Sequence, residues 1–104
     1  TVVLISLPSE AERPRAYATA KQLRARGIAT EVFHAPLKFG KQIRYAERKG
    51  IPYVLFLGDN QVEVRDIRSG QQGPIDVAVW SPPAEELEVE VRAAAAPSAG
   101  EGGA

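Results

Sequence analysis

The residues best suited to chemistry are polar or basic, and they fall in two short stretches. Residues 38–49 (KFGKQIRYAERK) carry five basic residues and one glutamate. Residues 65–72 (RDIRSGQQ) combine two arginines, an aspartate and two glutamines. Cations contact phosphates, whereas arginines, amides and carboxylates can recognise the edges of bases. The two stretches are therefore candidates for binding a nucleic acid.

Residues 38–49 have the periodicity of an amphipathic helix. At about 3.6 residues per turn, Phe39, Ile43 and Ala46 form an apolar stripe that is predicted to pack on a sheet. The opposite face and the flank beside it hold the polar residues: Lys41, Arg44 and Arg48, then Lys38, Gln42, Tyr45 and Lys49. Two interpretations stay open, a solvated charged face or a phosphate-binding surface with Tyr45 available for stacking.

Residues 65–72 also have two interpretations. They form either a polar hairpin with a surface Arg–Asp pair or a segment that reads unpaired bases. We expect the helix and this hairpin to lie on the same side of the molecule, where they would grip one RNA loop together.

Composition limits the possible classes of protein. The chain has 104 residues, which fits one domain, and its 44% hydrophobic and 25% charged residues are typical of soluble domains. There is no apolar run of about 18 residues, so no membrane partner is expected. Cysteine is absent, which excludes disulfides and thiolate chemistry. With no signal peptide visible, a cytoplasmic location is expected.

Charge is unevenly distributed along a chain whose net charge is zero. Residues 1–81 carry twelve basic and eight acidic residues, whereas residues 82–104 carry one arginine and five acids. Because nucleic-acid binders are usually basic overall, binding here has to depend on the local placement of the cations.

The order of the hydrophobic runs predicts an α/β fold. Apolar strands over residues 1–7, 28–34 and 53–58 alternate with helices, which predicts right-handed crossovers and parallel strands. Strands over residues 62–68, with a bulge near Asp66, and over residues 74–80 are predicted to add antiparallel at the sheet edge. The prediction is a three-layer, five-stranded mixed sheet flanked by helices, in the order β-α-β-α-β-β-β-α, with the first three strands parallel.

The helix boundaries follow from local signals. The first helix begins with a capping box at Ser9 and Glu12 or with Pro14 as its first residue, and the second ends at Gly50. A third helix is predicted from about Pro83. The domain is expected to span residues 1–92, followed by a flexible small-residue tail over residues 93–104.

Several of these pieces, in order, resemble the C-terminal anticodon-binding domain of class II aminoacyl-tRNA synthetases, and most of all that of the bacterial histidyl enzymes. The resemblance covers about residues 1–90. It rests on Lys38, Lys41-Gln42, Tyr45-Ala46, Gly50-Ile51-Pro52, Gly58-Asp59, Arg65-Asp66-Ile67 and Ser69-Gly70-Gln71-Gln72. The family turn usually reads Gly-Glu-Gln, so Gln71 replaces a glutamate, and any contact that the acid makes in the family is altered here.

The resemblance implies a function in recognition. This domain would hold the anticodon loop of a tRNA, while a separate N-terminal catalytic domain joins histidine to that tRNA with ATP and Mg. The chain alone would be non-catalytic and need no cofactor, and the parent would be a homodimer. The implied RNA-binding residues are Lys38, Lys41, Gln42, Tyr45, Arg65, Arg68, Gln71 and Gln72.

Other functions stay open at this point. The same domain occurs in non-synthetase regulators and accessory subunits, and the fold also suits a protein-interaction module. A small doubly wound enzyme would need reactive groups at the ends of its parallel strands, and His34-Ala35 and Gly58-Asp59 supply few. His34 is the sole histidine and has no neighbouring set of metal ligands in the sequence.

Overall fold

The computed structural model describes residues 1–59 and 61–83, and it contains one five-stranded sheet. The strands lie in the order β2-β1-β3-β4-β5, with β1 parallel to β2 and β3, and with β3–β4 and β4–β5 antiparallel. Their bounds are β1 Val3–Ile5, β2 Thr30–Val32, β3 Tyr53–Leu57, β4 Val62–Asp66 and β5 Gln72–Ile75. The predicted mixed sheet with three parallel strands is confirmed.

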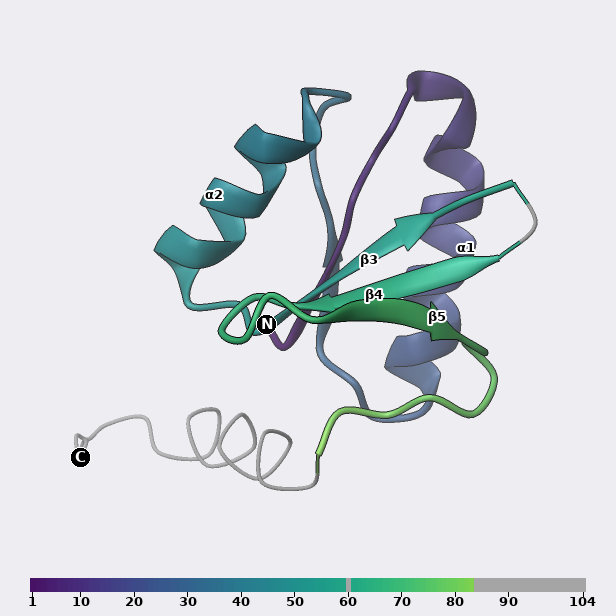
Figure 1. The fold of residues 1–104 in the computed structure, drawn as a ribbon. Helices are drawn as coiled ribbons and strands as arrows, with labels where there is room; N and C mark the ends of the chain where they lie inside the picture. The colour runs from purple at the N-terminus through teal and green to yellow at the C-terminus, as the bar shows by residue number, and fades with distance from the viewer. Residues whose placement is uncertain (60, 84–104) are drawn as a thin grey trace, which may run out of the picture.

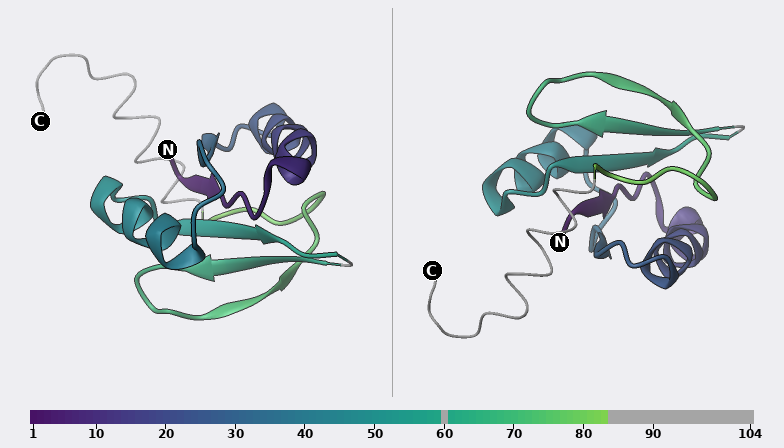
Figure 2. Two further views of the ribbon diagram at one scale, coloured as in Figure 1. Left: turned by 90° about the horizontal axis from the view of Figure 1, so that it is seen from above. Right: turned by 90° about the horizontal axis from the view of Figure 1, so that it is seen from below.

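Two α-helices cover the parallel part of the sheet. Helices α1 (Arg13–Ala25) and α2 (Phe39–Lys49) lie on either side of β1 and β2 (Figure 1). Views from above and below show the β4–β5 hairpin extending beyond the helices (Figure 2). A single 3-10 turn, Glu10–Glu12, precedes α1, and Pro14 lies in the first turn of α1. Ser9 makes no side-chain capping hydrogen bond. Of the two predicted starts of this helix, the one at Pro14 therefore agrees better with the structure than the capping box.

The core is built around β1. Every residue of β1 is fully buried, which explains why this segment is continuously apolar rather than alternating. Leu23 of α1 and Ala46 of α2 pack against the sheet and have no exposed surface. Gly50 ends α2 in the left-handed conformation, with φ 71°, as its position after the apolar stripe predicts. No helix among the described residues is long and apolar enough to cross a bilayer.

The antiparallel hairpin differs from its prediction at both ends. Strand β4 pairs without interruption from Val62 to Asp66, and Ile67 begins a turn, so the predicted bulge is wrong. Strand β5 starts at Gln72, inside the predicted turn, and ends at Ile75. Residues 76–80 form a turn instead of a strand, because Asp76 accepts backbone hydrogen bonds from Val79 and Trp80. The predicted third helix, the boundary at residue 92 and the tail lie outside the described residues.

Helix α2 is rotated about its axis relative to the prediction. Its buried residues are Gln42 and Ala46, whereas Phe39, placed in the predicted apolar stripe, is 45% exposed. The Gln42 amide accepts a hydrogen bond from Leu7 N at 2.9 Å and donates to Leu7 O at 3.0 Å and Leu37 O at 2.7 Å. It thus pairs backbone groups beyond the end of β1 that would otherwise be unsatisfied. The prediction that Gln42 faces RNA is wrong, because its amide is buried and occupied.

Candidate nucleic-acid interface

A row of polar side chains crosses the antiparallel part of the sheet on the face that α2 covers. Directly paired residues of antiparallel strands share a face. Phe56 pairs with Glu63, Val54 pairs with Arg65, and Arg65 pairs with Gln72, while Phe56 packs against Phe39 of α2. We call the polar residues on this face the sheet-face row: Gln61, Glu63, Arg65 and Gln72.

Hydrogen bonds fix the orientation of the sheet-face row. Gln72 donates from Nε2 to Glu63 Oε1 at 2.7 Å, and its Oε1 accepts from Arg65 Nη1 at 3.4 Å. Gln61 donates from Nε2 to the other Glu63 oxygen at 3.1 Å. The Gln72 amide therefore presents one remaining N–H and one oxygen lone pair side by side, and Arg65 keeps further N–H donors. Such a set can pair with the edge of a base.

An aromatic pair borders the row. The rings of Phe39 and Phe56 meet edge to face with centroids 5.2 Å apart. Together with Gly58, Gln61 and Glu63 they line a hollow of about 250 Å³. Gly58 is required there, because a Cβ would lie 2.7 Å from Gln61 O. Sequence reasoning assigned no RNA role to Phe39 or Glu63, although the alternation Gln61, Glu63, Arg65 indicates a shared face.

Arg68 and Gln71 lie in the turn that joins β4 to β5. The Arg68 guanidinium is 3.9 Å from Asp66 Oδ1 and 6.0 Å from the Tyr53 ring centroid. Asp66 Oδ1 also accepts from the backbone N–H groups of Arg68 and Ser69, so this carboxylate organises the turn. Gln71 is exposed, and its backbone oxygen accepts from Asp66 N at 2.8 Å. Gln71 directly precedes Gln72 in the chain, and Arg68 lies beside Asp66 and Tyr53.

A second hollow lies on the other flank of α2. It measures about 410 Å³, and we call it the α2–β2 hollow. Its lining combines cations and rings: Phe33, His34, Leu37, Lys41, Arg44, Tyr45 and Arg48. The three cations are exposed and no carboxylate lines the hollow. This composition suits an anion.

Tyr45 is a wall of the α2–β2 hollow. Its ring meets Phe33 edge to face at 5.2 Å, Lys49 Nζ lies 5.8 Å from its centroid, and its hydroxyl donates to Glu31 at 3.1 Å. Burial, followed by the Glu31 carboxylate, raises the pKa of the hydroxyl above its ordinary value. These contacts leave Tyr45 packed within the domain, so the geometry favours a positioning role for it over the stacking expected from the sequence.

The structure separates two groups that the sequence placed together. Lys41 belongs to α2, which covers the sheet face that carries Gln72. Lys41 nevertheless lines the hollow beside Phe33, whereas the sheet-face row borders α2 at Phe39. The rotation of α2 that buries Gln42 causes this separation. Lys38 is exposed at the N-terminus of α2, where its backbone oxygen accepts hydrogen bonds from the backbone N–H groups of Lys41 and Gln42.

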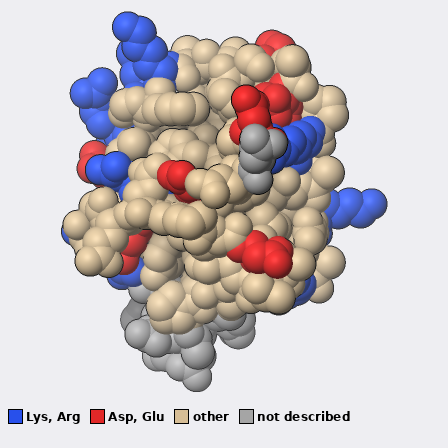
Figure 3. Space-filling model, turned by 45° about the vertical axis from the view of Figure 1, so that its right-hand side comes forward, with Lys and Arg blue, Asp and Glu red and all other residues tan. Residues whose placement is uncertain are grey.

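Charges of both signs are mixed on the face shown in Figure 3. Lys and Arg side chains stand mostly at the margins of this view, on the left and on the right, and several Asp and Glu side chains gather at the upper right beside a basic one. This face is therefore not a broad basic surface. It offers a polar row with fixed geometry and a separate cluster of cations.

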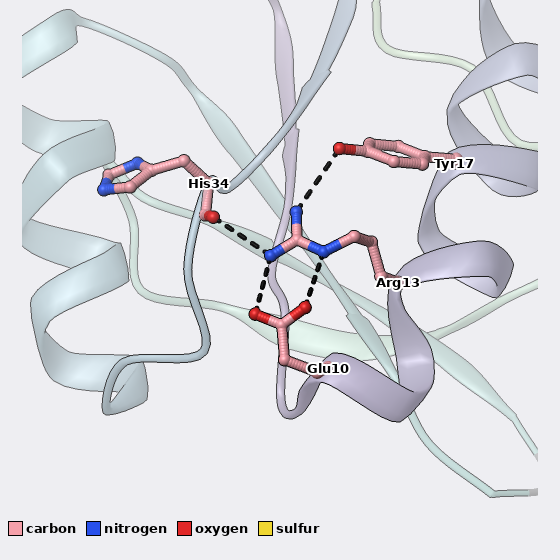
Figure 4. A network of polar contacts seen from close by, with 4 residues as sticks. All are labelled: Glu10, Arg13, Tyr17 and His34. Atoms are coloured by element: carbon pink, nitrogen blue, oxygen red, sulfur yellow. Dashed lines mark hydrogen bonds and ion pairs between the residues drawn. The ribbon is translucent and has the colours of Figure 1, made fainter.

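An ion pair holds the His34 side of the α2–β2 hollow in place. Arg13 donates from Nε and Nη2 to the two oxygens of Glu10 at 2.7 and 2.8 Å, and it also donates to His34 O at 3.1 Å and to Tyr17 Oη at 3.3 Å (Figure 4). The contact joins the start of α1 to the segment that follows β2. It therefore limits the movement of His34.

This ion pair predicts a pH-dependent contribution to stability. The Arg13 hydrogen bond lowers the pKa of Glu10 below its ordinary 4.5. The stabilisation is therefore present above about pH 4.5 and is lost as pH falls through the lowered folded-state pKa. Glu10→Gln should lower the melting temperature at neutral pH, and the difference from the parent should shrink in acid.

The check is a series of thermal melts between about pH 7 and about pH 3. Tyr17→Phe is the matched control, because it removes one hydrogen bond to Arg13 and leaves the charges, so its difference from the parent should not vary with pH. A Glu10→Gln difference that stays constant over this range would contradict the assignment.

Comparison with known proteins identifies a family model and several related ligases. Residues 1–80 match the family model described as "Anticodon binding domain". The chain is 45% identical over 96 residues to the histidine–tRNA ligase of Micrococcus luteus, and 46% identical over 84 residues to that of Thermobifida fusca. These matches cover 88% and 78% of this chain, and 21% and 19% of the ligases. The chain thus spans about a fifth of the length of the curated relatives it matches.

Solved structures share the fold. The crystal structure of histidyl-tRNA synthetase from Nostoc sp. PCC 7120 superposes with a TM-score of 0.72 at 22% identity, covering 88% of this chain and 22% of that one. The RNA binding domain of threonyl-tRNA synthetase from Cryptosporidium parvum gives 0.63 at 18% identity, with the same coverage. The family model matches residues 1–80, which is more than half of the chain, and so shows that the chain belongs to the anticodon binding domain family.

Proposed function

We propose that this chain is the anticodon-recognition domain of a histidine–tRNA ligase and that it reads the anticodon loop with the sheet-face row. The observation that carries the proposal is the hydrogen-bonded row Glu63–Gln72–Arg65 beside the exposed ring of Phe39. Membership of the anticodon-binding family and the similarity to histidine–tRNA ligases support it.

The row suits unpaired bases in three ways. Arg65 can donate two parallel hydrogen bonds to a base edge, and Gln72 can donate and accept at once. Glu63 accepts from both neighbouring amides and so holds the Gln72 amide in one orientation. Phe39 is 45% exposed at the end of the row, where a base splayed out of a loop can stack.

Catalysis and its cofactors are assigned to another part of the parent protein. Among the described residues there is no group of three or more His, Asp or Glu side chains that could hold a metal ion. We assign ATP and Mg to a separate catalytic domain that joins histidine to the tRNA while this domain holds the loop. We propose this catalytic domain as part of the parent protein, and we propose that the parent is a homodimer located in the cytoplasm.

The proposal is tested by binding of the anticodon stem-loop of histidine tRNA. The chain should bind the matched loop more tightly than a hairpin with the same stem and a scrambled loop. Affinity for both should fall as salt rises, because phosphate contacts release counterions. Calorimetry at several salt concentrations measures both effects. Equal affinity for the two loops at every salt concentration would refute loop recognition.

A second candidate function is docking of another protein on the same face, since Phe39 beside the row is an exposed apolar residue. The two functions make different predictions for the row. RNA binding requires Arg65 and Gln72, whereas protein docking on the apolar side chains would persist in Arg65→Ala and would not depend on the loop sequence.

A further inference from the structure

We propose that the α2–β2 hollow is a second RNA-binding site, which takes a backbone phosphate that lies outside the bases read by the sheet-face row. This inference rests on the proposed function, since it requires an RNA loop on the sheet. It assigns a separate role to Lys41, Arg44 and Arg48, with His34 and Tyr45 as the wall behind them.

The first support is a cluster of cations that folding alone does not explain. Lys41, Arg44 and Arg48 follow one another at spacings of three and four residues, so they are neighbours on one flank of α2 and repel. None of the ion pairs among the described residues involves them. A repulsive cluster that faces a concave surface is suited to an anionic ligand that neutralises it.

The second support is that the wall of the hollow is held in position. The backbone of His34 is fixed by Arg13, which Glu10 binds through both of its oxygens (Figure 4). Tyr45 is fixed at its ring by Phe33 and at its hydroxyl by Glu31. The hollow is therefore preorganised, and a ligand does not have to order these groups when it binds.

The third support is position, which also says which phosphate is bound. The hollow and the sheet-face row lie on opposite flanks of α2, and a helix with its side chains is about 10–12 Å wide. The phosphate in the hollow thus belongs to a nucleotide outside the bases on the sheet, on the side where the loop joins the stem.

The test combines a protein variant with RNA length. Arg44→Gln should bind the complete stem-loop about tenfold more weakly and reduce the slope of log affinity against log salt by about one. The loss should be equal for matched and scrambled loops, since a phosphate carries no sequence. The same variant should bind a single-stranded oligonucleotide of the loop bases alone as well as the parent does, because that RNA lacks the phosphate.

The controls separate this site from general charge effects and from misfolding. Lys21→Gln removes one exposed charge on α1 and should change neither affinity nor slope. The melting temperature of Arg44→Gln should equal or exceed that of the parent, because the change relieves repulsion with Arg48.

Two results would overturn the inference without touching loop recognition. These are an unchanged affinity of Arg44→Gln for the stem-loop, or an equal loss on the stem-loop and on the short oligonucleotide. Failure of the proposed function would be visible in the parent chain, as equal binding of matched and scrambled loops.

Discussion

Arg65→Ala is expected to remove most of the preference of the chain for one loop sequence over another. Arg65 lies in β4, and its guanidinium is held beside Gln72 Oε1 at 3.4 Å. A bidentate arginine–guanine contact contributes about 1–3 kcal/mol of discrimination, which corresponds to about 5- to 150-fold in relative affinity. The measurement is the ratio of dissociation constants for the matched hairpin and for hairpins in which each guanine of the loop is replaced by adenine.

Two variants make this result specific. Arg65→Lys keeps the charge but loses the planar fork, so it should retain salt-dependent binding and lose discrimination. Arg68→Ala, three residues further along, should have the smaller effect on discrimination, because Asp66 and the Tyr53 ring already neighbour that guanidinium. If Arg68→Ala abolishes discrimination and Arg65→Ala does not, base reading occurs in the turn and not on the sheet.

Gln42→Leu is expected to cause the largest loss of stability. Leucine has a similar size but leaves Leu7 N, Leu7 O and Leu37 O without the partner that Gln42 supplies. The two Leu7 groups are buried, and each buried polar group left unpaired costs about 1–3 kcal/mol, so the free energy of unfolding should fall by about 2 kcal/mol or more. That is a large part of the stability of an ordinary domain, which is about 5–15 kcal/mol.

Urea unfolding of the variant and the parent measures this loss. The neighbouring change Lys41→Leu is the matched control, since Lys41 is exposed and an exposed substitution usually alters stability by less than about 0.5 kcal/mol. An unfolding free energy of Gln42→Leu within that margin of the parent would show that the buried amide is not needed to hold α2 on the sheet.

The elements that could be predicted from the sequence are those with local signals. The continuous apolar run of β1, the run of β3 and the stop at Gly50 reflect burial and backbone conformation that a few neighbouring residues determine. The start of β5 at Gln72 could not be predicted, because glutamine and glycine are usual in turns and the pairing with Arg65 across the hairpin overrides that preference.

The candidate site was predicted in part, and the missing part depends on contacts between distant residues. The burial of Gln42 depends on Leu7, which lies 35 residues away in sequence, and no periodicity in residues 38–49 indicates it. That contact rotates α2, exposes Phe39 and places Lys41 away from Gln72. The role of Glu63 depends on the hairpin register, which brings it to Gln72.

Amide chemical-shift mapping on the isotope-labelled chain, titrated with the anticodon stem-loop of histidine tRNA, tests loop recognition by the sheet face most directly. The largest shifts are expected along β4 and β5 at Glu63, Arg65 and Gln72 and at the start of α2, with a scrambled loop affecting the strands much less. Shifts that concentrate on α1 around Lys21, or that are the same for both loops, would contradict it.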